Sequence, residues 1–187
     1  MLEEIDRSIN VLSKGGIIVY PTDTVWGIGC DATNAAAVDR IYKLKKRNET
    51  KSMIVLVSDT DMLKDYVKNI PEISWDLINC FDQPTTIIYP SARNIAKNLI
   101  GPDGSIAIRI VKDDFCKQMI TLFGKPIVST SANISGGKTP LLFSMITKEI
   151  LSAVDYVITL GHGIIKQTKS STIIKLDQDG HYEIVRQ

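Results

Sequence analysis

The sequence predicts one α/β domain over residues 1–187, a twisted mixed sheet of about seven strands flanked by helices. Three observations predict this class. Short β-branched segments alternate with segments of helical spacing, and a length of 187 residues suits one domain with a full core. The end of the chain has the pattern of a β-hairpin, which makes the sheet mixed. No internal repeat or low-complexity linker divides the chain.

The helices are predicted from the spacing of their apolar residues and from capping residues. Leu2, Ile5 and Ile9 share one face of the first helix, which ends at the glycines 15–16. Thr33 or Asn34 caps a second helix with a basic C-terminal end. Four further helices are expected. One begins at a capping residue within 58–61 and reaches residue 70, one begins at 71, one runs from 113 or 114 to 124, and one covers 142–151.

The strands are predicted from short β-branched and aromatic runs bounded by proline, glycine and polar residues. They are expected over residues 17–20, 53–57, 86–89, 106–111, 126–129, 156–160, 172–176 and 182–185. Asp179 and Gly180 form the expected turn between the last two strands. The segment 20–32, after the first strand, is interpreted as a loop.

Composition excludes several classes of protein. The chain is 44% hydrophobic, and its 22 Lys+Arg against 21 Asp+Glu argue against disorder, coiled coil and a nucleic-acid coat protein. Its three cysteines are far apart and it has only two histidines, which argues against structural zinc and disulfides. An acidic N-terminus and the lack of any apolar run near the roughly 20 residues of a membrane span predict a cytoplasmic protein without membrane contact.

Residues 20–32 form the first candidate site, because hydroxyls, Asp23 and two glycines follow a strand end. Ligands of open α/β sheets gather in such loops. A turn in which Asp23 and the threonines bond their own backbone explains the residues equally well. The segment 27–32 also matches the dinucleotide fingerprint G-x-G-x-x-A, which we reject because residues 21–26 separate it from the strand.

The second candidate site lies within residues 40–51, where six cations accompany one acid. A solvated helix end is the commoner explanation, since cations offset the dipole at a helix C-terminus. However, the run leads directly into a predicted strand. Such a strand would hold Lys45, Arg47 and Lys51 near a sheet edge, where they could converge on a polyphosphate.

The third candidate site is residues 126–137, a strand that runs into four hydroxyls, Asn133 and two glycines. These are the components of an anion cradle without a Walker lysine, although a polar loop with capping residues has the same composition. The sequence contains no G-x-x-x-x-G-K-[ST], H-E-x-x-H or G-x-S-x-G motif, so covalent catalysis is not indicated. The three segments together suit a nucleotide and a small polar acid held by positioning and charge.

Taken together, the segments 20–32, 45–47 and 128–136 resemble the YrdC family of threonylcarbamoyl-AMP synthases. The resemblance continues through 107–110 and 171–174 and spans nearly the whole chain. It implies a concave, basic cleft and a nucleotidyltransferase that joins L-threonine, bicarbonate or CO2 and ATP into threonylcarbamoyl-AMP and pyrophosphate. It also implies a tRNA threonylcarbamoyltransferase machinery that modifies adenosine 37 of tRNAs reading ANN codons, and it leaves direct tRNA contact open.

The resemblance further implies roles for individual residues. Lys45 and Arg47 match a K-x-R motif and are the expected catalytic pair, while Ser131 and Asn133 match an S-x-N motif. The implied ATP-binding residues are Lys45, Arg47, Ser129, Ser131, Asn133 and Arg186, and the implied threonine- and carbamate-binding residues are Thr24, Thr86, Arg109 and Ser171. No protein-held metal is implied, because Mg2+ is expected to arrive with ATP.

The chain departs from the family pattern at three positions. Asn48 stands where the family has proline, and Trp26 stands where it usually has tyrosine. Gln83 stands where the family has glycine, and its side chain would crowd a close backbone approach near Thr86. The alternative function is a non-catalytic RNA-binding module that uses the basic residues 43–51, whose RNA affinity would fall steeply with salt.

Overall fold

A computed structural model describes residues 1–46, 53–164 and 170–187. It confirms the α/β class and the mixed sheet. The predicted number of about seven strands is too low: in the part of the chain that it describes, nine strands form one sheet in the order β7-β1-β2-β6-β3-β5-β4-β8-β9. The strands are β1 Ile18–Pro21, β2 Trp26–Gly29, β3 Ile54–Val57, β4 Thr85–Tyr89, β5 Ile106–Ile110, β6 Ile127–Ser131, β7 Tyr156–Val157, β8 Thr172–Leu176 and β9 Tyr182–Arg186.

Six α-helices and two 3-10 turns accompany these strands in the described ranges. They are α1 Leu2–Ser13, α2 Ala35–Lys45, α3 Thr60–Tyr66, α4 Ile73–Cys80, η1 Lys97–Leu99, α5 Asp114–Phe123, η2 Phe143–Met145 and α6 Lys148–Ala153. The capping predictions are confirmed. The side chains of Asn34, Asp59 and Asp113 accept hydrogen bonds from the first turns of α2, α3 and α5, and Gly124 ends α5 in the left-handed conformation.

The expected loop at 20–32 is wrong, because part of it is strand β2, which pairs antiparallel with β1 and β6. Residue propensities do not predict this strand, because two of its four residues are glycines. They are required by close packing. A Cβ on Gly29 would lie 2.5 Å from the Val128 carbonyl oxygen, and one on Gly27 would lie 3.2 Å from Thr22 Cγ2. Both glycines lie inside a strand, so the dinucleotide fingerprint is indeed a chance match.

Three predicted elements are shorter than expected. The helix over 142–151 is instead η2 and α6, because Ile146 and Thr147 take extended conformations between them. The helix expected to reach residue 70 ends at Tyr66, where Val67 turns extended and pairs with Ala92. Of the strand expected over 156–160, only Tyr156–Val157 form a strand, which pairs with β1.

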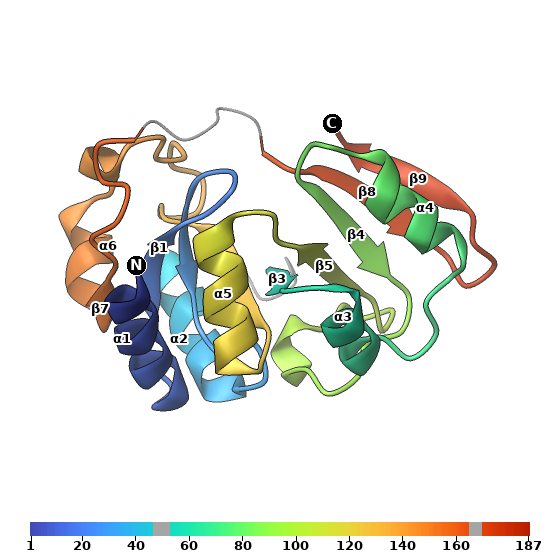
Figure 1. The fold of residues 1–187 in the computed structure, drawn as a ribbon, viewed down its shortest axis with the longest axis horizontal. Helices are drawn as coiled ribbons and strands as arrows, with labels where there is room; N and C mark the ends of the chain where they lie inside the picture. Colours follow the sequence, from blue (N-terminus) through green and yellow to red (C-terminus); the bar gives the residue numbers. More distant parts are fainter. Residues whose placement is uncertain (47–52, 165–169) are drawn as a thin grey trace.

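Neighbouring residues of the central strands pack into opposite faces of the sheet. Val55 belongs to one buried cluster, which includes residues of α2, α3 and α4, while Leu56 belongs to another, which includes residues of α1 and α5. Helices α1 and α5 lie side by side on that second face (Figure 1). Among the described residues, the second cluster takes none from β4, β8 or β9, so α1 and α5 cover only half of this face.

Candidate functional site

A cleft of about 270 Å³ occupies the uncovered half of that sheet face. Arg109 reaches it because Arg109 alternates along β5 with Ile108, which packs into the opposite cluster. The lining comes from both ends of the sheet, from the β1–β2 turn and β6 to β8 and β9. The sheet must therefore curve around the cleft. Among the described residues, fifteen line the cleft, of which eight are serine or threonine and two are arginine.

The β1–β2 turn supplies the first hydroxyls. Thr22 Oγ1 accepts hydrogen bonds from the backbone nitrogens of Thr24 (3.1 Å) and Val25 (3.2 Å) and donates to the Val25 carbonyl (2.7 Å). This hydroxyl turn fixes the backbone locally. The hydroxyls of Thr22 and Thr24 lie 3.0 Å apart, and both residues line the cleft. The predicted turn, in which a threonine bonds its own backbone, is thus confirmed, and a role of this segment in ligand binding stays a prediction.

Two arginines of the described residues line the cleft, one from a central strand of the sheet and one from an edge strand. Arg109 on β5 is buried, and its Nη2 lies 3.0 Å from Asp23 Oδ1. Arg186 on β9 donates from Nη2 to the Ser171 carbonyl at 2.8 Å. Partial burial, and then the nearby charge of Arg109, lower the pKa of Arg186 below its ordinary value. Two converging cations in one cleft favour an anionic ligand.

Ser171 lies at the cleft wall and Thr86 lies behind it. Their hydroxyls share a hydrogen bond of 2.8 Å between β4 and the start of β8. Both side chains are buried, but only Ser171 belongs to the lining. The structure therefore places Thr86 as a support for Ser171. A direct contact between Thr86 and substrate stays a prediction.

Lys45 lies on the last turn of α2 and is almost fully buried, 1% exposed. Its Nζ donates to the carbonyl oxygens of Ser131 and Asn133, each at 2.5 Å, and its own carbonyl accepts from the Ser135 nitrogen at 2.9 Å. The lysine thus ties α2 to the loop that follows β6, and it is not part of the cleft lining. Its contact with ATP stays a prediction, and Arg47 lies outside the described residues.

The two residues of the S-x-N motif have different positions: one lines the cleft, and the other bonds the backbone of the loop after β6. Ser131 lines the cleft with Ser129, whereas Asn133 Nδ2 donates to the carbonyls of Ile134 and Gly137, both at 2.8 Å. The six predicted residues that the structure brings together in the cleft are Thr24, Arg109, Ser129, Ser131, Ser171 and Arg186.

Sequence reasoning missed several lining residues. Thr22 and Ser170 are direct neighbours of recognised motif residues, so their positions were a usable signal. Thr139 and Ile173 carried none, because a loop threonine and a strand isoleucine are ordinary anywhere. The sequence placed Asp23 in the first candidate site or in a turn, but it gave no sign that this carboxylate pairs with Arg109.

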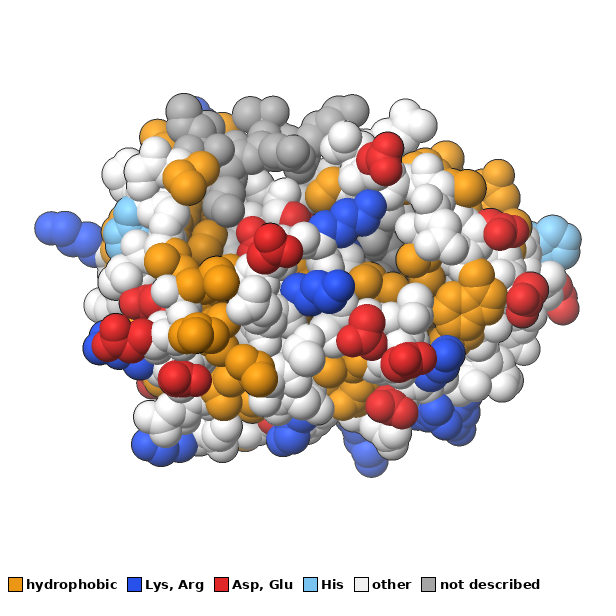
Figure 2. Space-filling view, viewed as in Figure 1, with side chains coloured by type: hydrophobic (Ala, Val, Ile, Leu, Met, Phe, Trp, Pro, Cys, Tyr) orange, Lys and Arg blue, Asp and Glu red, His pale blue; other side chains and the backbone are white. Residues whose placement is uncertain are grey.

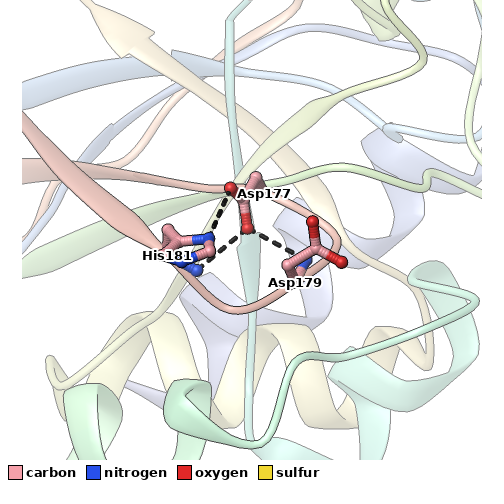
Figure 3. Close-up of side chains that lie close together, drawn as sticks. All are labelled: Asp177, Asp179 and His181. Carbon is pink, nitrogen blue, oxygen red and sulfur yellow. Dashed lines mark hydrogen bonds and ion pairs between the residues drawn. The ribbon is translucent and has the colours of Figure 1, made fainter.

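The described lining contains no carboxylate that could hold a metal ion. The described residues offer one cluster of candidate ligands elsewhere, Asp177, Asp179 and His181, all exposed in the β8–β9 turn (Figure 3). The backbone nitrogens of Asp179 and His181 each donate to Asp177 Oδ1 at 2.9 Å, and His181 Nδ1 lies 3.1 Å from Oδ2. The turn itself thus accounts for this grouping.

Two observations concern the outside of the molecule. Across the described ranges, no helix is both long enough and apolar enough to cross a bilayer. Acidic and basic side chains are interspersed on the face shown in Figure 2, without a continuous field of one sign. The overall net charge of +1 agrees with this mixture.

Comparison with known proteins identifies the family. Residues 10–187 match the Sua5/YciO/YrdC family, whose description is "Telomere recombination". The chain belongs to this family. As a Sua5/YciO/YrdC protein it is 32% identical over 167 residues to a threonylcarbamoyl-AMP synthase of Xanthomonas euvesicatoria, a match that covers 88% of this chain and 89% of the relative. It is 34% identical to one of Pseudoalteromonas translucida, covering 82% and 84%.

Solved structures agree with the family fold. E. coli YciO, 24% identical, superposes with a TM-score of 0.86 over 100% of this chain and 89% of YciO. P. abyssi Sua5 in complex with L-threonine, 25% identical, gives a TM-score of 0.79 over 92% of this chain. This chain spans only 50% of that Sua5 chain.

Proposed function

We propose that this chain is an L-threonylcarbamoyl-AMP synthase, a nucleotidyltransferase that uses L-threonine, bicarbonate or CO2 and ATP. The observation that carries the proposal is the cleft in which Arg109 and Arg186 converge among eight hydroxyl side chains. A threonine carboxylate, a carbamate and a triphosphate are all anions that such a cleft would hold. The relatives named threonylcarbamoyl-AMP synthase, and the Sua5 structure with L-threonine, support the same ligands.

The reaction has two steps. The neutral amine of threonine adds to CO2, which forms an N–C bond and releases a proton to solvent. An oxygen of the resulting carbamate then attacks the α-phosphorus of ATP. A new O–P bond forms, the bond from the α-phosphorus to the bridging oxygen breaks, and pyrophosphate leaves. Positioning and charge neutralisation suffice for this chemistry, so no nucleophilic side chain is needed.

The cleft residues divide this work. The guanidinium of Arg109 holds the carboxylate or the carbamate, because it is buried at the cleft and always charged. A hydroxyl such as Thr24 pairs with the hydroxyl of threonine, which disfavours amino acids that lack one. Arg186, Ser129 and Ser131 hold phosphate and ribose oxygens, and Lys45 and Arg47 complete the nucleotide site as the family resemblance implies.

Magnesium enters this scheme as part of the substrate. The described cleft offers arginines and hydroxyls rather than free carboxylates, which suits Mg2+ that is bound by ATP phosphates and water. We further propose that the enzyme works in the cytoplasm, and that a separate transferase machinery passes the threonylcarbamoyl group to adenosine 37 of tRNAs reading ANN codons.

Pyrophosphate release in omission experiments tests the proposed function. Purified protein with MgATP, L-threonine and bicarbonate is expected to release pyrophosphate, and leaving out any one substrate is expected to reduce release to background. Serine and valine serve as matched amino-acid controls, one without the methyl group and one without the hydroxyl. Release at the same rate without threonine, or no release from folded protein, would contradict the proposal.

A further inference from the structure

The carboxylate of Asp23 is buried beside the cleft and is not used by the mechanism above. It lies in the β1–β2 turn with its side chain 8% exposed, and its Oδ1 is 3.0 Å from Nη2 of Arg109, whose side chain is 3% exposed. Arg109 lines the cleft and Asp23 does not. Asp23 therefore contacts the arginine from outside the ligand-binding space.

The turn that carries Asp23 is held by hydrogen bonds of its threonine hydroxyls. Thr22 and Thr24 on either side are joined by their hydroxyls, and the Thr22 hydroxyl also binds the backbone of Val25. The other carboxylate oxygen, Oδ2, lies 3.5 Å from the backbone nitrogen of Lys112, just beyond the end of β5. Asp23 is thus fixed between its own turn and the strand that carries Arg109.

Charge rather than hydrogen-bond alignment holds the pair together. In the described part of the chain, Asp23 Oδ1 and Arg109 Nε are buried and neither makes an aligned hydrogen bond. Arg186 also lines the cleft, and its pKa is lowered by burial and then by the charge of Arg109. Without Asp23, Arg109 would lose the carboxylate that it pairs with in the described structure, and the repulsion between Arg109 and Arg186 would be less well offset.

We propose that Asp23 is a positioning residue that orients the Arg109 guanidinium toward the substrate and offsets one of the two arginine charges of the cleft. Through the first effect it raises the rate of the chemical step. Through the second it weakens anion binding enough for pyrophosphate to leave. The role in the chemical step rests on the proposed function, whereas the charge effect depends only on the cleft.

The test compares Asp23→Asn with wild type in turnover and in binding of pyrophosphate, measured by calorimetry in the presence of Mg2+. We expect kcat to fall about 10- to 100-fold, as is typical when a group that orients a ligand-binding residue is lost. We expect pyrophosphate to bind more tightly, by roughly three- to tenfold, because a negative charge is removed beside the anion. A residue with only a structural role would not tighten binding.

Asp31→Asn is the matched control. Asp31 is also a buried carboxylate, 6% exposed and 2.9 Å from a cation, Lys125 Nζ, but it does not line the cleft. Its substitution is expected to leave kcat and pyrophosphate affinity within about twofold of wild type. Asp23→Glu keeps the charge and moves the carboxylate by one methylene group. It is expected to keep wild-type pyrophosphate affinity and to lose part of kcat.

Each outcome decides the proposal. Normal turnover in Asp23→Asn, or pyrophosphate binding that is unchanged or weaker, would overturn it. If Asp23→Asn does not fold, Asp23→Glu decides: lowered kcat with wild-type affinity supports the proposal, and a joint loss of both overturns it. If wild type binds pyrophosphate but makes no adenylate, the proposed function fails. The pyrophosphate affinities of wild type and Asp23→Asn then still test whether Asp23 weakens anion binding.

Discussion

Lys45 is a charged side chain in a buried position, and its two carbonyl partners explain how the fold tolerates it. A buried ammonium group is costly unless its donors are satisfied. Here the donors hold the carbonyls of Ser131 and Asn133, the two residues of the S-x-N motif. The K-x-R and S-x-N motifs are therefore parts of one structural unit, in which a lysine on α2 sets the path of the loop after β6.

Lys45→Met is expected to lower the free energy of unfolding by about 2–4 kcal/mol, because two hydrogen bonds from a charged donor are lost. It should also reduce turnover, because Ser131 loses its support. Urea unfolding measures the first effect and pyrophosphate release the second. The neighbouring Lys46→Met is the control, since Lys46 is 68% exposed and paired only with Glu149 in the described ranges. Equal stability of the two variants would refute this role for Lys45.

At the scale of elements, β2 can lie where it does because its glycines have no Cβ atom. A Cβ on Gly29 would meet the Val128 carbonyl oxygen at 2.5 Å and the Tyr20 ring at 2.8 Å. The strand lies between β1 and β6, and its N-terminal end follows the turn that carries Thr22, Asp23 and Thr24. Close packing of β2 thus sets where the cleft hydroxyls of Thr22 and Thr24 lie.

Gly29→Ala is expected to destabilise the protein by about 1–3 kcal/mol, because backbone must shift to admit the methyl group. Thermal or urea unfolding measures the change. Gly163→Ala is the matched control, since a Cβ there meets nothing within 4 Å among the described residues and the residue does not have a positive φ. A Gly29 variant as stable as the Gly163 variant would show that the β1–β2–β6 packing is looser than described.

Helix α1 is joined to β7 and to the segment after it by one carboxylate. Glu4 accepts hydrogen bonds from Thr159 Oγ1 at 2.7 Å and from the Tyr156 hydroxyl at 2.9 Å. Burial alone would raise the pKa of Glu4, but the hydrogen bonds from Thr159 and Tyr156 outweigh it and leave the pKa below its ordinary value of 4.5. Ionised Glu4 therefore contributes stability above pH 4.5, and this is lost as the pH falls through the folded-state pKa.

The stability difference between wild type and Glu4→Gln is accordingly expected to shrink as the pH is lowered from about 6 to about 3. Urea unfolding at a series of pH values measures it. Glu3→Gln, on the exposed face of α1, controls for the loss of a surface charge. A Glu4→Gln difference that is constant across this range would contradict the docking role of Glu4.

At the scale of the whole molecule, sequence reasoning predicted the class, the mixed sheet and most helix ends, because those depend on local signals such as Asn34 and Gly124. It missed β2, whose glycines are explained only by close contacts with Tyr20 and Val128, far apart in the chain. The half of the cleft from β8 and β9 depends on sheet curvature, which no local pattern encodes.

The candidate site was predictable to a similar extent and for the same reason. The motif resemblance found Thr24, Arg109 and Ser131, which do meet in the cleft. It could not separate residues that line the cleft from those that support it, such as Thr86 behind Ser171. That distinction requires burial and partners, which come from long-range packing.

Mass spectrometry of the reaction product tests the central claim most directly. The purified protein is incubated with MgATP, L-threonine and carbon-13-labelled bicarbonate, and the small-molecule fraction is measured at once. The account predicts threonylcarbamoyl-AMP that carries the labelled carbon and forms only when all three substrates are present. Folded protein that binds ATP but yields only ADP, unlabelled AMP or no product would contradict it.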